Sequence, residues 1–296
     1  MKNNVYVSNP SRLRLQNYQL VVECPIEKSV KGTVPIEDMA LLLLDHPQIS
    51  ITQPLLQQLQ GNNIAVISCD AHHLPLGMML PLYGHTEHSD RVKHQIGATE
   101  TLKKQLWKQT VVAKIKNQQA LLQLVDRPYA RMSHYIDEVK PGDPTNCEAK
   151  AAQFYWKNLF DNFKRGRYEG GYNPYLNYGY AILRSMVARE IVATGLLPVL
   201  GIFHKNKYNP YTLADDLMEP YRPFVDKLVY NYVHSQSNLP EELTKEARVA
   251  LLRIATQDVM IDGKQRPLCV ALNTTVVSLY KCYTGTLRQL KYPNLD

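Results

Sequence analysis

The chain has 296 residues, of which 45% are hydrophobic, and this is enough for a folded core and excludes wholesale disorder. The net charge is +7, but it is unevenly distributed: residues 1–80 contain 5 Lys and Arg against 6 Asp and Glu, and the remainder contains 29 against 21. The basic excess in the later part indicates either a solubilising surface or a surface that binds nucleic-acid phosphates. The 5 cysteines include no C-x-x-C pair and the apolar runs are too short to span a bilayer, so we expect a cytoplasmic protein with no disulfide framework, zinc ribbon or membrane segment.

Short apolar runs separated by turn residues characterise the first 85 residues. Runs such as NVYVS (4–8), LRLQNYQLVVE (13–23), ALLLLD (40–45) and NIAVISCD (63–70) are bounded by Gly, Pro, Asn and Asp, which is typical of strands. One helical run, QPLLQQLQG (53–61), interrupts them. The sequence therefore predicts a β-sandwich-like domain over residues 1–85.

From about residue 90 the hydrophobic period becomes helical. The run from 100 to 125 places Leu106, Ile115 and Leu122 near one face. The opposite face is predicted to carry Lys103, Lys104, Lys108, Lys114 and Lys116. Further helices are predicted at 148–160, 180–194, 223–235, 240–255 and 270–290, with one hairpin turn at Asp262-Gly263. We expect an α+β fold in which residues 86–296 form a larger, all-helical catalytic domain.

The stretch YTLADDLMEP (211–220) brings three carboxylates together. Asp215 and Asp216 lie four and three residues before Glu219, so on a helix their side chains are neighbours and repel one another unless a cation lies between them. Thr212 and Asp215 also have the form of a capping box, in which case the stretch is an ordinary solvated helix start. His204 ends the preceding apolar segment, and an imidazole with carboxylates suits Mn²⁺ and accepts Mg²⁺.

A third acidic position is Glu148, in PGDPTNCEAKAAQFYW (141–156). Asp143-Pro144 indicates a helix start, and Thr145 followed by Glu148 again fits a capping box. From spacing alone Glu148 is either a cap or a ligand.

The motifs, taken together, resemble a known family. Glu148 at a helix start, NPYLNYGYAILRSMVARE (173–190), GLLPVLGIFH (195–204) and LADDLMEPYRPFVD (213–226) occur in the order found in the CRISPR adaptation integrase/endonuclease, the Cas-one family. The form is most like members from type II systems. The resemblance covers essentially the whole chain. It implies a catalytic metal site of Glu148, His204 and Glu219 that binds Mg²⁺ or Mn²⁺, with Asp216 in a supporting role.

The resemblance also implies the substrate and the partners. The 3′-hydroxyl of a short protospacer DNA would attack a phosphodiester in the repeat of a CRISPR array. The candidate DNA contacts are Lys164, Arg165, Arg167, Tyr168, Asn177, Tyr178, Lys205 and Arg222, although Tyr178 also fits a core position. The family forms homodimers through the β domain, and two dimers flank the small Cas-two protein in a heterohexamer. In type II systems Cas-nine and an accessory adaptation protein are further partners.

Two other functions remain open at this point. One is a stand-alone metal-dependent nuclease acting on branched or single-stranded DNA. The other is a non-catalytic DNA-binding scaffold in which Glu148 and Glu219 serve only as helix caps.

Overall fold

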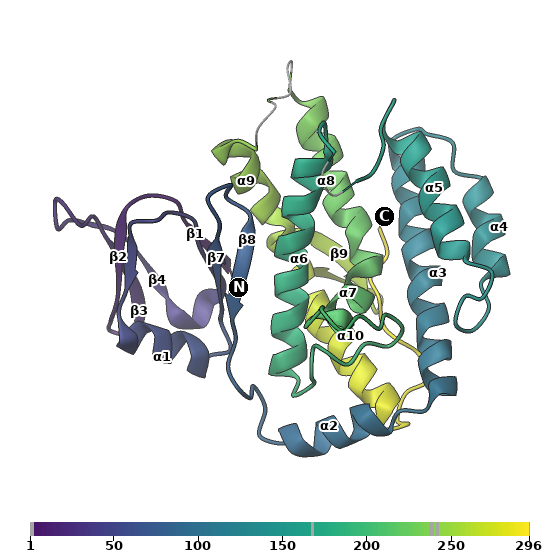
Figure 1. The fold of residues 1–296 in the computed structure, drawn as a ribbon, viewed down its shortest axis with the longest axis horizontal. Helices are drawn as coiled ribbons and strands as arrows, with labels where there is room; N and C mark the ends of the chain where they lie inside the picture. Colours follow the sequence, from purple (N-terminus) through teal and green to yellow (C-terminus); the bar gives the residue numbers. More distant parts are fainter. Residues whose placement is uncertain (1–2, 167–168, 237–239, 241–242, 296) are drawn as a thin grey trace. The chain divides into compact units, whose positions relative to one another are not determined.

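A computed structural model describes residues 3–166, 169–236, 240 and 243–295 (Figure 1). The chain divides into two compact units, Met1–Thr86 and Glu87–Asp296, and the sequence placed this boundary after residue 85. Two of the candidate DNA contacts, Arg167 and Tyr168, lie outside the described residues. Within the described ranges no helix is long and apolar enough to cross a membrane.

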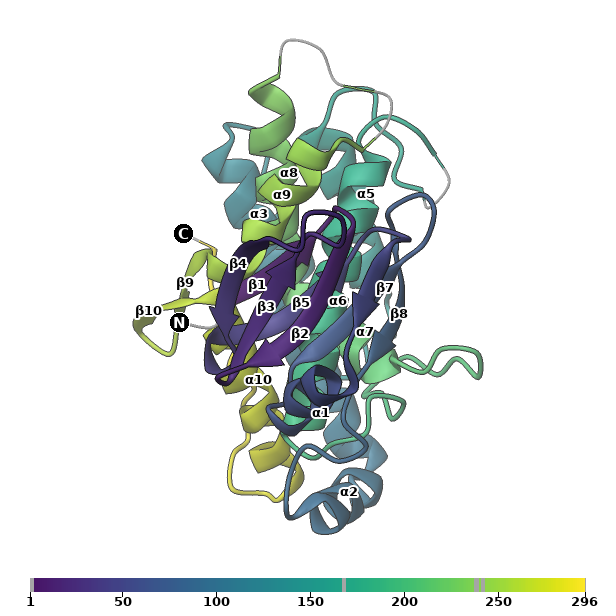
Figure 2. The ribbon, with the colours of Figure 1, turned by 90° about the vertical axis from the view of Figure 1, so that its left-hand side faces the viewer.

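The first unit contains two four-stranded sheets, whose strands are seen face-on in Figure 2. In one sheet three strands run parallel and the fourth is antiparallel, in the order β1 (Asn3–Val7), β5 (Met39–Leu44), β7 (Ala65–Cys69) and β8 (Pro75–Met79). The other sheet has the order β4 (Val30–Pro35), β3 (Gln19–Glu23), β2 (Ser11–Gln16) and β6 (Ile49–Ile51).

A turn divides the apolar run 13–23 into two strands of one hairpin. Asn17 and Tyr18 both have positive φ, 48° and 57°, and this is the backbone that a two-residue turn needs to reverse β2 into β3. The sequence pattern alone did not separate these strands, because Tyr18 is an uncommon turn residue.

The two sheets of the first unit share one apolar core. Leu13 and Leu20 from one sheet and Leu42 from the other are all fully buried in the same cluster. Helix α1 (Gln53–Gly61) adds Leu55 and Leu59, and the short turn η1 (Ile36–Asp38) adds Ile36. This arrangement confirms the sandwich-like prediction.

In its described residues the second unit is helical apart from one hairpin, which confirms the predicted α+β class. Its helices are α2 (His88–Gly97), α3 (Glu100–Leu124), α4 (Arg131–Glu138), α5 (Cys147–Leu159), α6 (Asn173–Ala193), α7 (Thr212–Met218), α8 (Arg222–His234), α9 (Lys245–Leu252) and α10 (Leu268–Tyr283), with short turns η2 (Glu219–Tyr221) and η3 (Arg253–Thr256). Strands β9 (Asp258–Ile261) and β10 (Lys264–Pro267) form the hairpin. Asp262 and Gly263 have φ of 54° and 70°, so the predicted turn is confirmed.

Helix α6 lies at the centre of this unit and contacts α7, α8, α9 and α10 (Figure 1). It begins seven residues before the predicted start, because Pro174 occupies the first turn, where a helix tolerates proline. Gly179 allows α8 to approach closely: a Cβ at this position would lie 2.5 Å from Val225 Cγ1. Helix α10 ends at Tyr283 rather than near residue 290, since Gly285 follows with φ of 75°.

Candidate metal centre

The N-terminus of α5 presents Glu148 but is capped by another residue. The carboxylate of Asp143 accepts hydrogen bonds from the backbone N–H groups of Cys147 and Glu148, each at 2.9 Å. Thr145 instead contacts Cys147 Sγ. The capping box predicted from Thr145 and Glu148 is therefore wrong, and the Glu148 side chain is not needed as a cap.

Helix α7 buries the acidic stretch instead of exposing it. Asp216 is fully buried and Glu219 is only 5% exposed. Thr212 donates to the Val199 carbonyl at 2.6 Å, and Asp215 pairs with Arg184 at 2.8 Å. The predicted capping box of Thr212 and Asp215 is wrong as well, because both side chains reach across to other segments.

Asp216 fixes the loop that carries His204. Its Oδ2 accepts from the backbone N–H groups of Ile202 and Phe203 at 2.6 and 2.9 Å. Its Oδ1 lies 2.5 Å from His204 Nδ1. A carboxylate on Nδ1 directs the lone pair of Nε2 outward, as in histidines that bind metals. The supporting role considered for Asp216 therefore has a geometry that fits it.

The tight path of this loop depends on Gly201. A Cβ there would lie 2.7 Å from the His204 carbonyl oxygen and 2.9 Å from Asp216 Oδ2. The His204 ring also makes a T-shaped contact with the buried Trp107, with centroids 5.3 Å apart, and Trp107 in turn stacks on Phe203. The imidazole is thus held between a buried carboxylate and an indole.

Lys114 of α3 connects the two glutamates. Its Nζ lies 2.7 Å from Glu148 Oε1 and 2.5 Å from Glu219 Oε2. Glu219 Oε1 in turn pairs with Arg222 at 3.0 Å. The sequence assigned Lys114 to the solvated face of its helix, and this is wrong: the residue is only 9% exposed.

A signal for Lys114 is visible in retrospect. Trp107, Val111, Gln118 and Leu121 lie one or two turns away on the same side of α3 and are all buried. A lysine in the middle of such a stripe needs an acidic partner. This row of residues could have indicated that Lys114 is buried, but the more numerous exposed lysines of the helix obscured the pattern.

The charges of the site act on one another. The hydrogen bond to Asp216 raises the pKa of His204 above its ordinary value. Burial lowers this pKa, but the negative charges of Asp216, Glu148 and Glu219 raise it further, so the net shift is upward. Burial alone would raise the pKa of Glu219, but Arg222 and then Lys114 outweigh burial and lower it. Glu148, His204 and Glu219 therefore share one electrostatic environment. In the described part of the chain, however, no group of three or more His, Cys, Asp or Glu side chains is arranged so that it could hold a metal ion.

The candidate DNA contacts differ in environment. Arg165 donates hydrogen bonds to Asn177 at 2.7 Å and to Asn173 at 2.8 Å. The guanidinium groups of Arg165 and Arg222 both lie over the Tyr180 ring, 5.3 and 4.7 Å from its centroid. Of these residues, Arg222 is the one that contacts Glu219. Tyr178 is fully buried, as its alternative reading as a core residue requires.

The two candidate lysines are largely exposed to solvent. The side chains of Lys164 and Lys205 are 84% and 76% exposed, each in a loose ion pair with a glutamate.

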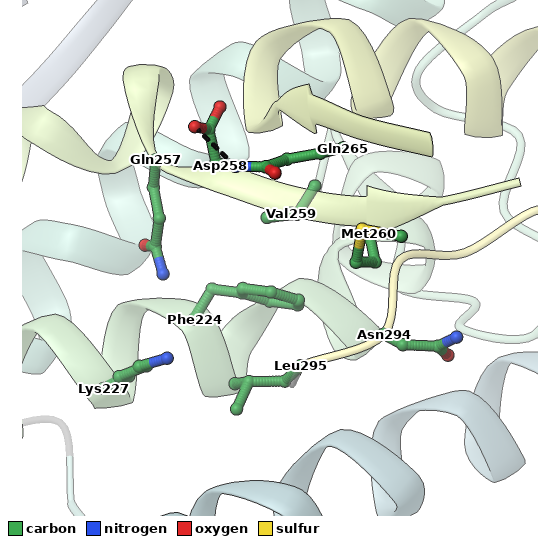
Figure 3. Close-up of a pocket in the computed structure, with 9 residues that line it drawn as sticks. All are labelled: Phe224, Lys227, Gln257, Asp258, Val259, Met260, Gln265, Asn294 and Leu295. Atoms are coloured by element: carbon green, nitrogen blue, oxygen red, sulfur yellow. Dashed lines mark hydrogen bonds between the residues drawn. The ribbon is translucent and has the colours of Figure 1, made fainter. Parts of the chain in front are cut away.

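Two of the cavities in the described part of the second unit bear on the location of the site. One, of about 360 Å³, is lined by His204, Lys103 and Lys205 together with apolar residues such as Val199 and Leu200. The other, of about 160 Å³, lies between α8, the β9–β10 hairpin and residues 294–295, and is shown in Figure 3. None of the predicted site residues lines it, and its one carboxylate, Asp258, is bonded to Gln265 at 3.0 Å. Of the candidate metal ligands, His204 lines the larger of these two cavities.

Comparison with known proteins decides the family. Residues 5–263 match the model of the family described as CRISPR associated protein Cas1. The chain belongs to the Cas1 family. It is 34% identical to the CRISPR-associated endonuclease Cas1 of Neisseria meningitidis serogroup C (strain 8013), over 99% of this chain and 96% of that protein. The family assignment made from the motifs is thereby confirmed.

Solved structures share the Cas1 fold at low identity. A casposase bound to an integration product has a TM-score of 0.80 at 18% identity, covering 98% of this chain and 92% of that one. A chain of a Cas6-RT-Cas1–Cas2 complex has a TM-score of 0.76 at 18% identity, covering 100% of this chain and 36% of that one.

Proposed function

We propose that this Cas1 protein is a metal-dependent DNA integrase and endonuclease of CRISPR adaptation, which joins the 3′-hydroxyl ends of short protospacer DNA to the repeat of a CRISPR array by transesterification. The observation that carries the proposal is the meeting of Glu148 and Glu219 around a single cation beside His204. Membership of the Cas1 family and the name of the Neisseria relative support it.

The donor set suits Mg²⁺ or Mn²⁺. Two carboxylates from different segments already converge on one positive charge, and Glu219 Oε2 is buried without accepting a hydrogen bond of good geometry. Glu148, His204 and Glu219 would hold the ion. When bound, it would polarise the scissile phosphate and lower the pKa of the attacking hydroxyl.

The residues of the chain itself contribute positioning and charge. Asp216 keeps Nδ1 of His204 occupied and so directs Nε2 toward the ligand. Arg222 neutralises one oxygen of Glu219 and presents the rest of its guanidinium along Tyr180, where a phosphate could meet it. No protein nucleophile is required, since the attacking group belongs to the DNA.

The partners are part of the proposal. The Cas6-RT-Cas1–Cas2 complex contains a chain of this fold, so we propose the small Cas2 protein as a partner. A homodimer through the first unit is supported by apolar side chains at and beyond β8, where Leu76 is 76% and Leu82 is 95% exposed. Cas9 and an accessory adaptation protein are proposed from the similarity to type II members. Light scattering of the protein alone and with Cas2 tests both assemblies.

A strand-transfer assay tests the activity. Labelled short duplexes ending in a 3′-hydroxyl or a 3′-dideoxy group are mixed with a supercoiled plasmid carrying the repeat, with Mg²⁺ or Mn²⁺ and with or without Cas2. We expect label to join the plasmid only from the hydroxyl end. Joining should be lost with EDTA and in Glu148→Ala, His204→Ala and Glu219→Ala.

The other outcomes separate the alternatives. Nicking without joining in the presence of Cas2 would indicate the stand-alone nuclease. DNA binding without either product would indicate the scaffold, for which Glu148 should then matter only for stability.

A further inference from the structure

Lys114 occupies the place between the two proposed carboxylate ligands. Its Nζ contacts Glu148 Oε1 and Glu219 Oε2, so these oxygens lie no further apart than the sum of 2.7 and 2.5 Å. The lysine belongs to α3, whereas the glutamates belong to α5 and η2. Three segments distant in sequence are thus joined by one ammonium group.

We propose that Lys114 is a built-in counter-cation that competes with the divalent metal for Glu148 and Glu219. In the metal-free protein the ammonium keeps the two carboxylates together, and metal binding expels it from between them. The inference rests on the proposed function, because it takes these two glutamates as metal ligands.

The two cations exclude each other on grounds of space and charge. Mg²⁺ or Mn²⁺ bound by an oxygen would lie roughly 2.1 Å from it. The Lys114 Nζ already lies 2.7 and 2.5 Å from the same two oxygens, so both cations would be in contact at the centre of a buried site. Like charges at that separation repel strongly in a partly desolvated environment. The flexible four-carbon stem of lysine allows the ammonium to swing away.

Without the ammonium the metal-free site would be unstable. Glu219 has a second cation, Arg222, but this meets only its Oε1. For Glu148, Lys114 is the one ion-pair partner within the described residues. The contact of Lys114 with Glu219 Oε2 lies within ion-pair distance but lacks the angle of a hydrogen bond.

Mn²⁺ binding to the full-length protein without DNA tests the proposal, measured by calorimetry. Lys114→Met removes the competitor, so we expect the Kd for Mn²⁺ to fall at least about tenfold. The reason is that an apparent Kd equals the intrinsic Kd divided by the fraction of protein that is competent to bind. Lys116→Met is the matched control: it changes the net charge equally from an exposed position on the same helix, and its Kd should stay within about twofold of the unmutated protein. An unchanged or weaker affinity in a folded Lys114→Met protein overturns the proposal.

Amine labelling of the unmutated protein gives a second readout that does not depend on a variant folding. Acetylation followed by mass spectrometry should leave Lys114 protected without metal and label it several-fold faster at saturating Mg²⁺, while Lys116 reacts equally in both. Equal labelling of Lys114 with and without bound Mg²⁺ also overturns the proposal.

Glu148→Gln separates this inference from the proposed function. If Glu148→Gln binds Mn²⁺ as tightly as the unmutated protein, or the unmutated protein binds none, the proposed metal site is wrong and the inference falls with it. If binding depends on Glu148 but neither Lys114 readout changes, only the inference fails.

Discussion

At the scale of single residues, Asp216 is the group on which the position of His204 depends. Its two oxygens accept from three backbone N–H groups and face one imidazole nitrogen. In Asp216→Asn an NH₂ group would replace one of these acceptors and face donors. We expect a loss of roughly 3 kcal/mol in the free energy of unfolding, measured by urea denaturation.

The neighbouring aspartate provides the control for that measurement. Asp215 is 24% exposed and pairs with Arg184, so Asp215→Asn should cost at most about 1 kcal/mol. Equal losses in the two variants would contradict the special role of Asp216.

Asp226 gives the protein a pH dependence of opposite sign to that of most carboxylates. Burial raises its pKa to about 6, although the hydroxyls of Tyr180 and Tyr155 donate to it. Because the folded state favours the protonated form, its stability contribution is present below about pH 4 and is lost as pH rises through about 6.

Asp226→Asn isolates this effect. The unmutated protein should lose about 3 kcal/mol relative to the variant between about pH 4 and about pH 7, because the amide does not titrate. Denaturation curves at several pH values measure the difference. We therefore expect the unfolding free energy of the unmutated protein minus that of the variant to decrease as pH rises. If it stays constant or increases, Asp226 is not held in its protonated form.

The sequence could suggest candidate site residues but not how they are connected. Glu148, His204 and Glu219 could be selected from their motifs, but Lys114 was overlooked, since a lysine on a long helix is usually solvated. Its burial depends on two acidic residues supplied by distant segments. The helix caps were misjudged for a related reason: Asp143 and Thr145 both fit a cap by type, and only the fold selects between them.

At the scale of secondary-structure elements, the start of α5 depends on Asp143. Asp143→Ala removes the acceptor for two backbone N–H groups and should cost about 1 to 2 kcal/mol in unfolding free energy. Thr145→Ala, two residues away, should cost less than about 0.5 kcal/mol. Thermal denaturation of both variants checks this, and a larger loss for Thr145 would restore the capping box.

The contact between α6 and α8 makes another prediction. Gly179→Ala would improve helix propensity by about 1 kcal/mol but would push a Cβ to 2.5 Å from Val225 Cγ1, so we expect a net loss of about 1 to 2 kcal/mol. In a Val225→Ala background the space is open and the same substitution should stabilise. Denaturation of the four proteins of this double-mutant cycle tests it, and a loss of the same size in both backgrounds would rule out the contact as the cause.

Elements with strong periodicity were predictable from the sequence, and pairing was not. Helix α5 and the hairpin at Asp262-Gly263 lie where they were expected. The parallel pairing of β1, β5 and β7 was not, because each strand pairs with a partner distant in the chain. Strand β6 was missed altogether because it has only three residues.

At the scale of the whole molecule, the uneven charge predicts where DNA affinity resides. If the second unit neutralises phosphates, affinity should fall steeply with salt, and Lys164→Ala or Lys205→Ala should each reduce the slope of log K against log salt by about 1. Lys31→Ala, in β4 of the first unit, should leave it unchanged. Fluorescence anisotropy with short duplexes measures the slope. Equal effects of all three substitutions would show that the affinity depends on the net charge of the protein and not on a surface of the second unit.

The backing of the His204 loop by Asp216 has an evolutionary consequence. The imidazole is anchored from inside by a carboxylate on α7, while the segment that follows it, from Lys205 to Tyr208, is exposed. Substitutions in that segment can therefore accumulate as lineages diverge without moving His204. Gly201 should not change, because any side chain at 201 would come within 2.7 Å of the His204 carbonyl oxygen and 2.9 Å of Asp216 Oδ2. Selection would thus keep the residues that hold His204 and allow the exposed segment from Lys205 to Tyr208 to vary. The reaction could then be retained while the surrounding surface adapts to different DNA.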